Sequence, residues 1–364
     1  MQVSSVLPLR VGVVGLGWAG DVHIKSYQQL ENVEVVAIAD VSLERLTQIG
    51  DTYGVPHRYT DYRELLQRDD LDAVSVCTPN QFHAPVAIAA LQREKHVLCE
   101  KPLARTTAEG VAMVQAAREA GRVLHVAFNH RARGDIAVLK RHIEEGGLGA
   151  IYHAKASWMR RNNIPVRGGW FMNRELAGGG PLIDLGVHVL DMALYLLGEP
   201  GVRSVSAATY AELGPLGRGG SRNQPVPQPF EVEDLATAFL RMENGTTLLL
   251  EAGWAVYGGM SDDYGVTLFG TEGGAEIAVK NYSWEDTLRM YTDVAGVPTE
   301  IRPKVPRGEY HQGVVRDFVE VIRSGDWATH DGREGLRRTR IIDACYASAA
   351  AGHEVALSEI PDVE

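Results

Sequence analysis

Cysteine is scarce in this chain of 364 residues, and three thiols are too few for a disulfide framework. Cys77 and Cys99 stand inside apolar runs, where we expect reduced, buried thiols. Long hydrophobic runs are lacking as well, since no stretch approaches the ~20 apolar residues of a membrane span. The first ten residues, up to Arg10, show no signal-peptide pattern. We therefore expect a cytoplasmic protein that does not enter the membrane.

Positive charge is in deficit, because 36 lysines and arginines face 47 aspartates and glutamates, a formal net charge of -11. Nucleic acids and anionic membranes both require a basic face, so neither is the expected partner. The composition, with 45% hydrophobic and 23% charged residues, is that of an ordinary globular protein. The length predicts two domains with cores of their own.

The first 130 residues alternate short apolar runs with helical stretches. The expected strands cover 11–14, 33–39, 73–77, 96–99 and 123–128, and the expected helices cover 20–30, 43–53, 82–94 and 107–120. Each strand is almost continuously apolar, as in a parallel sheet that is covered by helices on both faces. This alternation predicts a doubly wound α/β domain of the Rossmann type over residues 1–129.

After Asn129 the pattern changes, and we expect an α+β domain over residues 130–364 with an open, mostly antiparallel sheet. Helices are expected at 136–145, 181–197, 311–324 and 332–350, and strands at 151–158, 205–210, 235–242, 246–255, 266–269 and 275–279. Asn244-Gly245 marks a hairpin. The two closing helices can pack back on the first domain. Residues 213–230, rich in Gly and Pro, are expected to form a surface loop or an arm that contacts another subunit.

The sharpest motif is Gly15-Leu16-Gly17-Trp18-Ala19-Gly20, which lies between the first strand and the first helix. In this context a GxGxxG run predicts a dinucleotide site. The first glycine allows a tight turn, the second lets the backbone approach the pyrophosphate, and the third lets the helix pack on the strand. The helix N-terminus then offers N–H groups to the phosphates. We expect Gly15, Gly17, Trp18, Ala19 and Gly20 to bind the cofactor.

Asp40 ends the second strand, twenty residues after Gly20, where a carboxylate can hold the ribose hydroxyls. Its charge would repel a 2′-phosphate, so we expect NAD, although Arg45 nearby leaves NADP open. Thr78, Asn80 and His83 follow the third strand, at the edge where open α/β sheets hold ligands. They either contact the cofactor or simply begin the next helix.

Glu100-Lys101-Pro102 follows the fourth strand directly. The pair of charged residues is expected to reach the cofactor site, because it leaves a buried strand at the carboxyl end of the sheet. Pro102 stops the strand and can fix the direction of the lysine through a cis bond. Glu100 and Lys101 are therefore further candidates for cofactor binding.

A run of three glycines, 178–180, precedes an apolar segment that carries Asp184, His188 and Asp191. The glycines suit a close approach of the backbone to a ligand. At roughly 100° per residue the three ionisable side chains fall on one stripe of a helix that is otherwise buried. Buried charge is costly unless it is paired or used. We expect an acid/base site and no metal; a metal site or a structural polar network are the alternatives.

These motifs, in this order, resemble those of the Gfo/Idh/MocA oxidoreductases, a family that includes inositol dehydrogenases and glucose-fructose oxidoreductase. The resemblance spans the chain from Val11 to about Leu357. It implies that the outer face of the second sheet forms subunit contacts, giving homodimers or homotetramers. By similarity, Lys101, Asp184 and His188 match the catalytic lysine, aspartate and histidine of the family.

The chemistry of such an enzyme fits these three residues. Oxidation of a secondary alcohol requires a base for the hydroxyl proton while hydride leaves for the nicotinamide. His188 is the expected base, since an imidazole ordinarily has a pKa of roughly 6.5. Lys101 would stabilise the alkoxide, and Asp184 would orient the substrate or the imidazole.

The substrate is expected to be a polyol, a sugar or a cyclitol. Two tryptophans flank a segment with hydrogen-bonding groups, which suits a sugar ring and its hydroxyls. The segment contains Trp158, Arg160, Arg161, Asn162, Asn163, Arg167 and Trp170. Core tryptophans beside a solvated loop are the alternative, and the arginines leave an acidic sugar open. Asn129 and Arg131, which follow the fifth strand, are also expected to contact the substrate. The complete set of expected substrate contacts is Lys101, Asn129, Arg131, Trp158, Arg160, Trp170, Asp184 and His188.

The resulting hypothesis is an NAD-dependent dehydrogenase that acts on a secondary alcohol of a sugar, sugar derivative or cyclitol. Two other functions compete with it. One is an NAD-dependent glycosidase that works by transient oxidation, and the other is a regulator that senses NAD(H) without catalysis. The presence of Lys101 and His188 argues against the regulator.

Overall fold

The computed structural model describes residues 7–166, 169–221 and 224–362 of the chain. These residues form two compact units. The first unit comprises the chain up to residue 129 together with 310–337, and the second comprises 130–309 together with 338–362. In the described part of the chain, every helix is too short or too polar to cross a bilayer.

The first unit contains a six-stranded parallel sheet in the order β3-β2-β1-β4-β5-β6. Its strands are β1 (Leu9–Val14), β2 (Val33–Ala39), β3 (His57–Tyr59), β4 (Ala73–Val76), β5 (His96–Cys99) and β6 (Leu124–Val126). β1 pairs with β2 on one side and β4 on the other, so the strand order reverses there. In doubly wound sheets the ligand lies outside the carboxyl ends of the strands at this point. The predicted Rossmann fold is confirmed.

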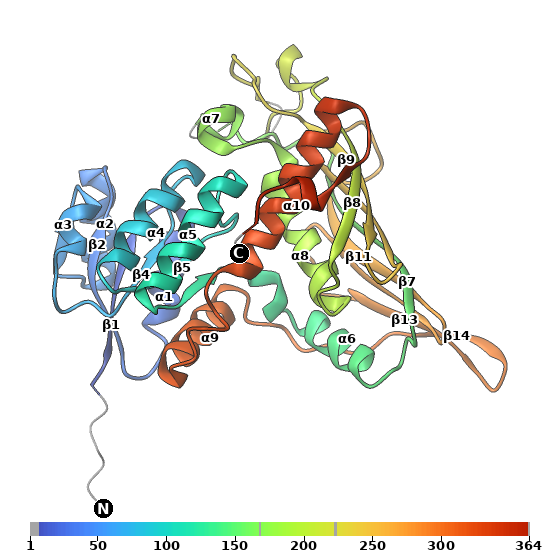
Figure 1. Ribbon diagram of the computed structural model, residues 1–364, viewed down its shortest axis with the longest axis horizontal. Coiled ribbons are helices and arrows are strands. Elements are labelled where there is room, and N and C mark those ends of the chain that lie inside the picture. Colours follow the sequence, from blue (N-terminus) through green and yellow to red (C-terminus); the bar gives the residue numbers. More distant parts are fainter. Residues whose placement is uncertain (1–6, 167–168, 222–223, 363–364) are drawn as a thin grey trace, which may run out of the picture. The chain divides into compact units, whose positions relative to one another are not determined.

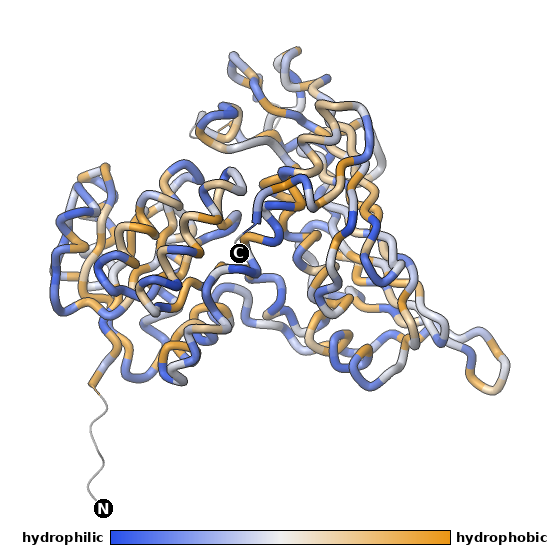
Figure 2. Tube along the Cα trace, in the orientation of Figure 1, coloured by the Kyte–Doolittle hydropathy of each residue, from blue (hydrophilic) through white to orange (hydrophobic). Residues whose placement is uncertain are grey.

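Helices cover this sheet, and they change from hydrophobic to hydrophilic around each turn (Figures 1 and 2). They are α1 (Trp18–Tyr27), α2 (Leu43–Tyr53), α3 (Tyr62–Leu66), α4 (His83–Gln92), α5 (Thr107–Ala120) and α9 (His311–Ser324). α9 comes from the end of the chain and packs against α1. Its apolar residues Val315 and Phe318 are fully buried in one core with Val11 and Ile24. A helix predicted at 311–324 thus belongs to the first unit.

One strand of this sheet was not predicted. β3 consists of three residues, His57-Arg58-Tyr59, at the edge of the sheet, and two of them are exposed. Without an apolar run, its sequence carries no strand signal.

The second unit is built on a nine-stranded sheet in the order β14-β13-β12-β11-β7-β10-β9-β8-β15. Its strands are β7 (Ile151–Arg160), β8 (Val202–Tyr210), β9 (Leu235–Met242), β10 (Thr247–Gly253), β11 (Asp262–Gly270), β12 (Gly274–Lys280), β13 (Leu288–Val294), β14 (Val297–Ile301) and β15 (Val355–Ala356). All neighbours pair antiparallel except β7 and β10. The expected open, mostly antiparallel sheet is confirmed, as is the hairpin at Asn244-Gly245 between β9 and β10.

One face of this sheet is buried, and the side chains on the other face are more exposed to solvent. Buried and half-buried residues alternate along β9, β10 and β12. The buried face packs against α6 (Gly134–Glu144) and α8 (Val187–Leu196). α7 (Arg174–Ala177) is a short helix, and α10 (Arg333–Ala351) belongs to this unit from residue 338 onward.

Two details differ from the sequence-based expectations. The helix expected from residue 181 begins with a π-helical segment, Leu182–Gly186, before α8. The hairpin of β13 and β14 was missed because most of its side chains are half-buried or exposed and show no apolar alternation. The described part of 213–230 is a loop, as expected, and at its start the Asp234 carboxylate accepts the N–H groups of residues 212–214.

Candidate functional site

The glycine loop between β1 and α1 has the geometry that a dinucleotide requires. Gly15 has φ +88°, and a Cβ there would lie 2.6 Å from the carbonyl oxygen of Cys77. A Cβ on Gly20 would lie 2.0 Å from the carbonyl oxygen of Gly15. Around Gly17, in contrast, no atom of the described residues, apart from its immediate chain neighbours, lies within 4 Å of the Cβ position. Two of the glycines are thus required by the protein itself, while the space beside Gly17 is left for a ligand such as a pyrophosphate.

The Asp40 carboxylate lies against this loop. Its Oδ2 accepts the backbone N–H of Leu16 at 2.7 Å, and its Oδ1 accepts that of Ser42 at 2.8 Å. Arg45 donates to the carbonyl oxygen of Leu16 at 2.9 Å. Asp40 also lines a cavity of 450 Å³ together with Gly15 and other residues at the carboxyl ends of the strands. The residues present therefore fit the adenosine half of a nicotinamide dinucleotide, and Asp40 is the residue that could accept the ribose hydroxyls.

The three candidates after β4 have different surroundings. Thr78 lines the same cavity, and its Oγ1 is buried without a hydrogen-bond partner in the described part of the chain. Asn80 is buried and begins a 3-10 turn. His83 is also buried, and its ring nitrogens lie 2.7 Å from the carbonyl oxygen of Pro102 and 2.9 Å from that of Thr78. Burial lowers the pKa of His83, although both carbonyls oppose the shift. His83 thus ties two loops together, and this geometry does not favour the predicted direct contact with the cofactor.

Glu100-Lys101-Pro102 leaves the carboxyl end of β5, and the Lys101–Pro102 bond is cis, as predicted. Lys101 is half-buried. The Glu100 carboxylate is buried and faces His23 and His311, with Oε1 3.0 Å from His23 Nε2 and 3.4 Å from His311 Nε2. The carboxylate is therefore used inside the first unit rather than directed at the cofactor.

These three residues are also the one group of metal-ligand type side chains that gathers in the described ranges. Their ligand atoms lie within 4.8 Å of one another. Asp184, His188 and Asp191, which the sequence left open as a metal site, form no such group among the residues described.

In the second unit, Asp184 and His188 lie on the π-helical segment and on the first turn of α8. Asp184 is half-buried, and its Oδ2 accepts the indole N–H of Trp254 at 2.9 Å. The imidazole of His188 is 9% exposed and lies edge-on to His130, with ring centroids 4.8 Å apart, and 5.4 Å from Trp158. Aromatic rings thus hold the histidine, and an indole holds the aspartate.

Asp191, the third member of the stripe, belongs to a structural ion-pair network. Its carboxylate is buried and accepts hydrogen bonds from Arg131 at 2.8 Å and from Arg338 at 2.9 Å. Arg338 is itself buried and also contacts Glu199. The guanidinium of Arg131 is therefore directed at Asp191, and its predicted substrate contact competes with this structural role.

Two of the three glycines, Gly179 and Gly180, are required by packing within the protein, and the expected approach of a ligand to this run stays a prediction. A Cβ on Gly179 would lie 2.0 Å from the hydroxyl of Tyr346, and one on Gly180 would lie 2.1 Å from the carbonyl oxygen of Glu233. The Glu233 carboxylate accepts the N–H groups of Gly180 and Leu182 and the hydroxyl of Tyr346. Glu233 thereby caps the segment that carries Asp184.

The candidate substrate residues are only partly brought together. Arg160 lines a cavity of 370 Å³ with Asn163, Phe171 and others. Phe171 packs edge-on to Trp254, the partner of Asp184, with centroids 6.3 Å apart. Arg160 is also paired with Asp262 at 3.0 Å.

The two tryptophans contact residues that line this cavity, since the Arg160 guanidinium lies over the Trp158 ring at 5.4 Å, but neither they nor Asn129 are among its lining residues. Trp158 is 3% exposed and donates its N–H to Asp262, as a core tryptophan would. Trp170 stacks on Phe171. Asn129 is buried beside His311, with Nδ2 and Nδ1 3.3 Å apart. Arg167 lies outside the described residues.

Sequence reasoning missed three residues of these sites. His130 lies between Asn129 and Arg131, which the sequence analysis selected as substrate residues, and only this position in the chain indicated that it could contact the site. Trp254 and His311 are 70 and 211 residues away from Asp184 and Glu100 along the chain (254 − 184 and 311 − 100), and no local pattern links such pairs.

Comparison with known proteins agrees with both halves of this description. Residues 9–128 match the model of an oxidoreductase family with an NAD-binding Rossmann fold, and residues 136–276 match the GFO/IDH/MocA C-terminal domain. The chain is 33% identical to D-glucoside 3-dehydrogenase of Escherichia coli strain K12, over 96% of this chain and 98% of that protein. It is 30% identical to levoglucosan dehydrogenase of Pseudarthrobacter phenanthrenivorans, over 94% and 96% of the two chains. A solved structure of levoglucosan dehydrogenase with NADH and L-sorbose superposes with a TM-score of 0.85 at 26% identity, covering 98% of this chain and 100% of that one.

A methyl group at Gly17 separates the role of this glycine from that of its neighbours. We expect Gly17→Ala to leave the thermal unfolding temperature nearly unchanged, since Gly17 has φ -66° and open space at the Cβ position. NADH binding, measured by fluorescence titration, should weaken about tenfold or more, because the methyl group would occupy the approach to the pyrophosphate. Gly259→Ala, at another glycine with open space, is the matched control. Unchanged NADH affinity in Gly17→Ala would contradict the assignment of this loop.

Proposed function

The chain belongs to the GFO/IDH/MocA oxidoreductases, and from this premise we propose that it is an NAD-dependent dehydrogenase acting on a secondary alcohol of a sugar, sugar derivative or cyclitol. The observation that carries the proposal is the environment of His188. It is a titratable ring on a mostly apolar helix, four residues from an aspartate that an indole N–H holds in place. In the first unit of the same chain, the glycine loop and Asp40 fit a dinucleotide.

The proposed roles follow from the chemistry of the side chains. NAD, when bound, supplies the hydride acceptor. His188 takes the proton from the substrate hydroxyl and returns it in the reverse reaction. Lys101 holds that hydroxyl and stabilises the negative charge that develops on its oxygen. Asp184, fixed by Trp254, orients the substrate.

The cavity lined by Arg160, Asn163 and Phe171 supports a sugar as substrate. It combines hydrogen-bonding groups with an aromatic ring, and its 370 Å³ lies within the usual size of small-molecule sites. The relatives named above act on a glucoside and on levoglucosan, which are also sugar derivatives. Asn163 and Phe171 are therefore added to Arg160 as proposed substrate contacts.

Removal of the imidazole tests the central role. His188→Ala should lower kcat about 10²–10⁴-fold on a sugar that the wild type oxidises, because a general base contributes that much. Absorbance of NADH over a panel of polyols, aldoses and their acids identifies the substrate and measures kcat. NADH binding should persist, since its site belongs to the first unit.

The exposed His353 provides the matched control, His353→Ala, which should turn over at the wild-type rate. Wild-type turnover by His188→Ala would remove this residue from the mechanism. Release of a free sugar without net formation of NADH would instead identify the glycosidase.

The Asp40 carboxylate should determine the preference for NAD. In Asp40→Ser the ratio of kcat/KM for NAD to that for NADP should fall about tenfold or more, because the charge that repels a 2′-phosphate is gone. A tenfold change in this ratio corresponds to ~1.4 kcal/mol of discrimination between the two cofactors. Arg45, near the same loop, remains to attract the phosphate. Asp51→Ser, at an exposed aspartate on α2, is the control. An unchanged ratio would show that other residues select the cofactor.

We further propose that the open face of the second sheet joins copies of this chain into a homodimer or homotetramer. Exposed or half-buried residues of β7, β10 and β11, among them Lys155, Leu249 and Thr267, surround a hollow of 310 Å³ there. We expect Leu249→Lys to shift the mass measured by light scattering toward the monomer, because it adds a charge that would be desolvated between sheets. Lys95→Glu, a charge change outside this face, is the control, and an unaltered oligomer in Leu249→Lys would exclude this interface.

The cytoplasm is the proposed location, supported by three free, buried cysteines. Cell fractionation would check this assignment.

A further inference from the structure

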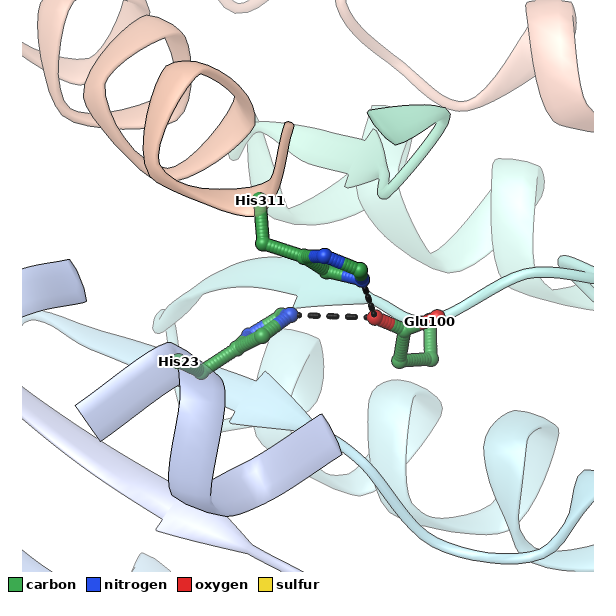
Figure 3. Close-up of side chains that lie close together, drawn as sticks. All are labelled: His23, Glu100 and His311. Atoms are coloured by element: carbon green, nitrogen blue, oxygen red, sulfur yellow. Dashed lines mark hydrogen bonds and ion pairs between the residues drawn. The ribbon is translucent and has the colours of Figure 1, made fainter. Parts of the chain in front are cut away.

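Three buried side chains from distant parts of the sequence meet inside the first unit (Figure 3). His23 comes from α1, Glu100 follows β5, and His311 is the first residue of α9. Their exposed fractions are 0%, 7% and 7%. None of them has a role in the mechanism proposed above, so the reason for an ionisable cluster at this place has to be sought in its contacts.

The two oxygens of Glu100 serve different partners. Oε1 contacts both histidines and lies 3.0 Å from His23 Nε2 and 3.4 Å from His311 Nε2. Oε2 accepts the backbone N–H of Lys101 at 3.1 Å. The carboxylate thus links the two histidines to the main chain of the proposed catalytic lysine.

From these contacts we propose that Glu100 is the positioning residue for Lys101, and that His311 holds Glu100 in the orientation this requires. The inference rests on the proposed function, because it assigns a purpose to the direction of Lys101. On the other side of the same segment, His83 holds the carbonyl oxygen of Pro102 at 2.7 Å. Residues 100–102 are therefore fixed at both ends.

The Nδ1 atoms of the two histidines, which face away from Glu100, have partners that favour hydrogen bonds from both rings to the carboxylate. Asn129 Nδ2 lies 3.3 Å from His311 Nδ1, and Ser75 Oγ lies 3.1 Å from His23 Nδ1. A neutral imidazole that accepts a hydrogen bond at Nδ1 carries its proton on Nε2, the atom that faces Glu100. Both rings can then donate to the carboxylate at the same time.

Burial alone would raise the pKa of Glu100, but the hydrogen bonds from His23 and His311 outweigh it and keep the pKa well below its usual range. The carboxylate is therefore ionised and can accept all three hydrogen bonds. A buried charge of this kind persists only where its partners are held in place.

The backbone before His311 indicates that its direction is constrained. Tyr310 has φ +47° and ψ -121°, a conformation that side chains with a Cβ rarely adopt. Such strain persists where the surrounding structure over-determines it. The ring of His311 also lies edge-on to Trp18 of the glycine loop, with centroids 5.2 Å apart. His311 therefore contacts the dinucleotide loop and the support of Lys101 together.

Three variants of the full chain test the proposal. His311→Leu removes the donor at similar volume, His311→Gln keeps an N–H that can reach Oε1, and Glu100→Gln replaces an acceptor of the Lys101 N–H by an amide. His353→Leu and Glu320→Gln, at exposed positions, are the matched controls. For each protein we would measure unfolding temperature, NADH affinity, kcat, KM, and the primary deuterium isotope effect with a sugar labelled at the oxidised carbon.

We expect His311→Leu and Glu100→Gln to lower kcat about 10–100-fold, as loss of a supporting hydrogen bond does elsewhere, with little change in NADH affinity. The isotope effect should rise, because hydride transfer becomes more fully rate-limiting. His311→Gln should recover most of the lost kcat. Equal losses in His311→Leu and His311→Gln would reduce the histidine to a packing role, and wild-type kcat in His311→Leu or in Glu100→Gln would overturn the proposal.

Metal analysis completes the test, because the same three side chains are of metal-ligand type. One outcome is that the purified protein contains about one zinc ion per chain, and that removal of the zinc by a chelator lowers the stability of the protein. This result would show that the three side chains form a metal site and not a hydrogen-bonded cluster. The proposed function has its own outcome: a wild type that oxidises no sugar of the panel refutes the dehydrogenase, whereas an active wild type with equally active cluster variants refutes only the positioning role.

Discussion

The contact between Gly15 and Gly20 is the constraint on which the first unit depends. The chain leaves β1, turns, and returns so closely that the carbonyl oxygen of Gly15 occupies the place of a Cβ on Gly20. This contact sets the start of α1, on which His23 lies one turn further along, while the Asp40 carboxylate at the end of β2 accepts a loop N–H. The space beside Gly17 remains open for the ligand. One backbone contact thus shapes the loop proposed to hold the phosphates and fixes where α1 begins.

The buried ionisable side chains of the described residues obey a second constraint, which is electrostatic. A charge in an apolar interior is stable only if hydrogen bonds compensate its loss of hydration. Glu100 has two imidazoles, Asp191 has two guanidinium groups, and Glu233 has two backbone N–H groups and a phenol. Asp184 differs from them, since it is half-buried and part of its surface stays exposed. Burial and hydrogen-bond partners therefore separate the supporting carboxylates from the one proposed to act.

Much of the fold and part of the site could be predicted from local patterns. The apolar strands of the first unit, the hairpin at Asn244-Gly245 and the closing helix at 311–324 all carry strong signals, because burial imposes a period on the sequence. β3 and the hairpin of β13 and β14 carry none, since exposed edge strands need no apolar alternation. The triple glycine shows another limit of local patterns: its small residues suggested a ligand, but packing against Tyr346 and Glu233 already requires Gly179 and Gly180.

The sequence by itself determined the dinucleotide loop, the Asp40 that follows it, and the candidate trio of Lys101, Asp184 and His188, because each depends on residue type and short spacing. Only the tertiary structure decided which neighbours hold these groups. His311 reaches Glu100 from a helix more than two hundred residues further along the chain, and Trp254 reaches Asp184 from the end of β10. Hydrogen bonds of this kind depend on where the elements pack in space, and no local spacing records that.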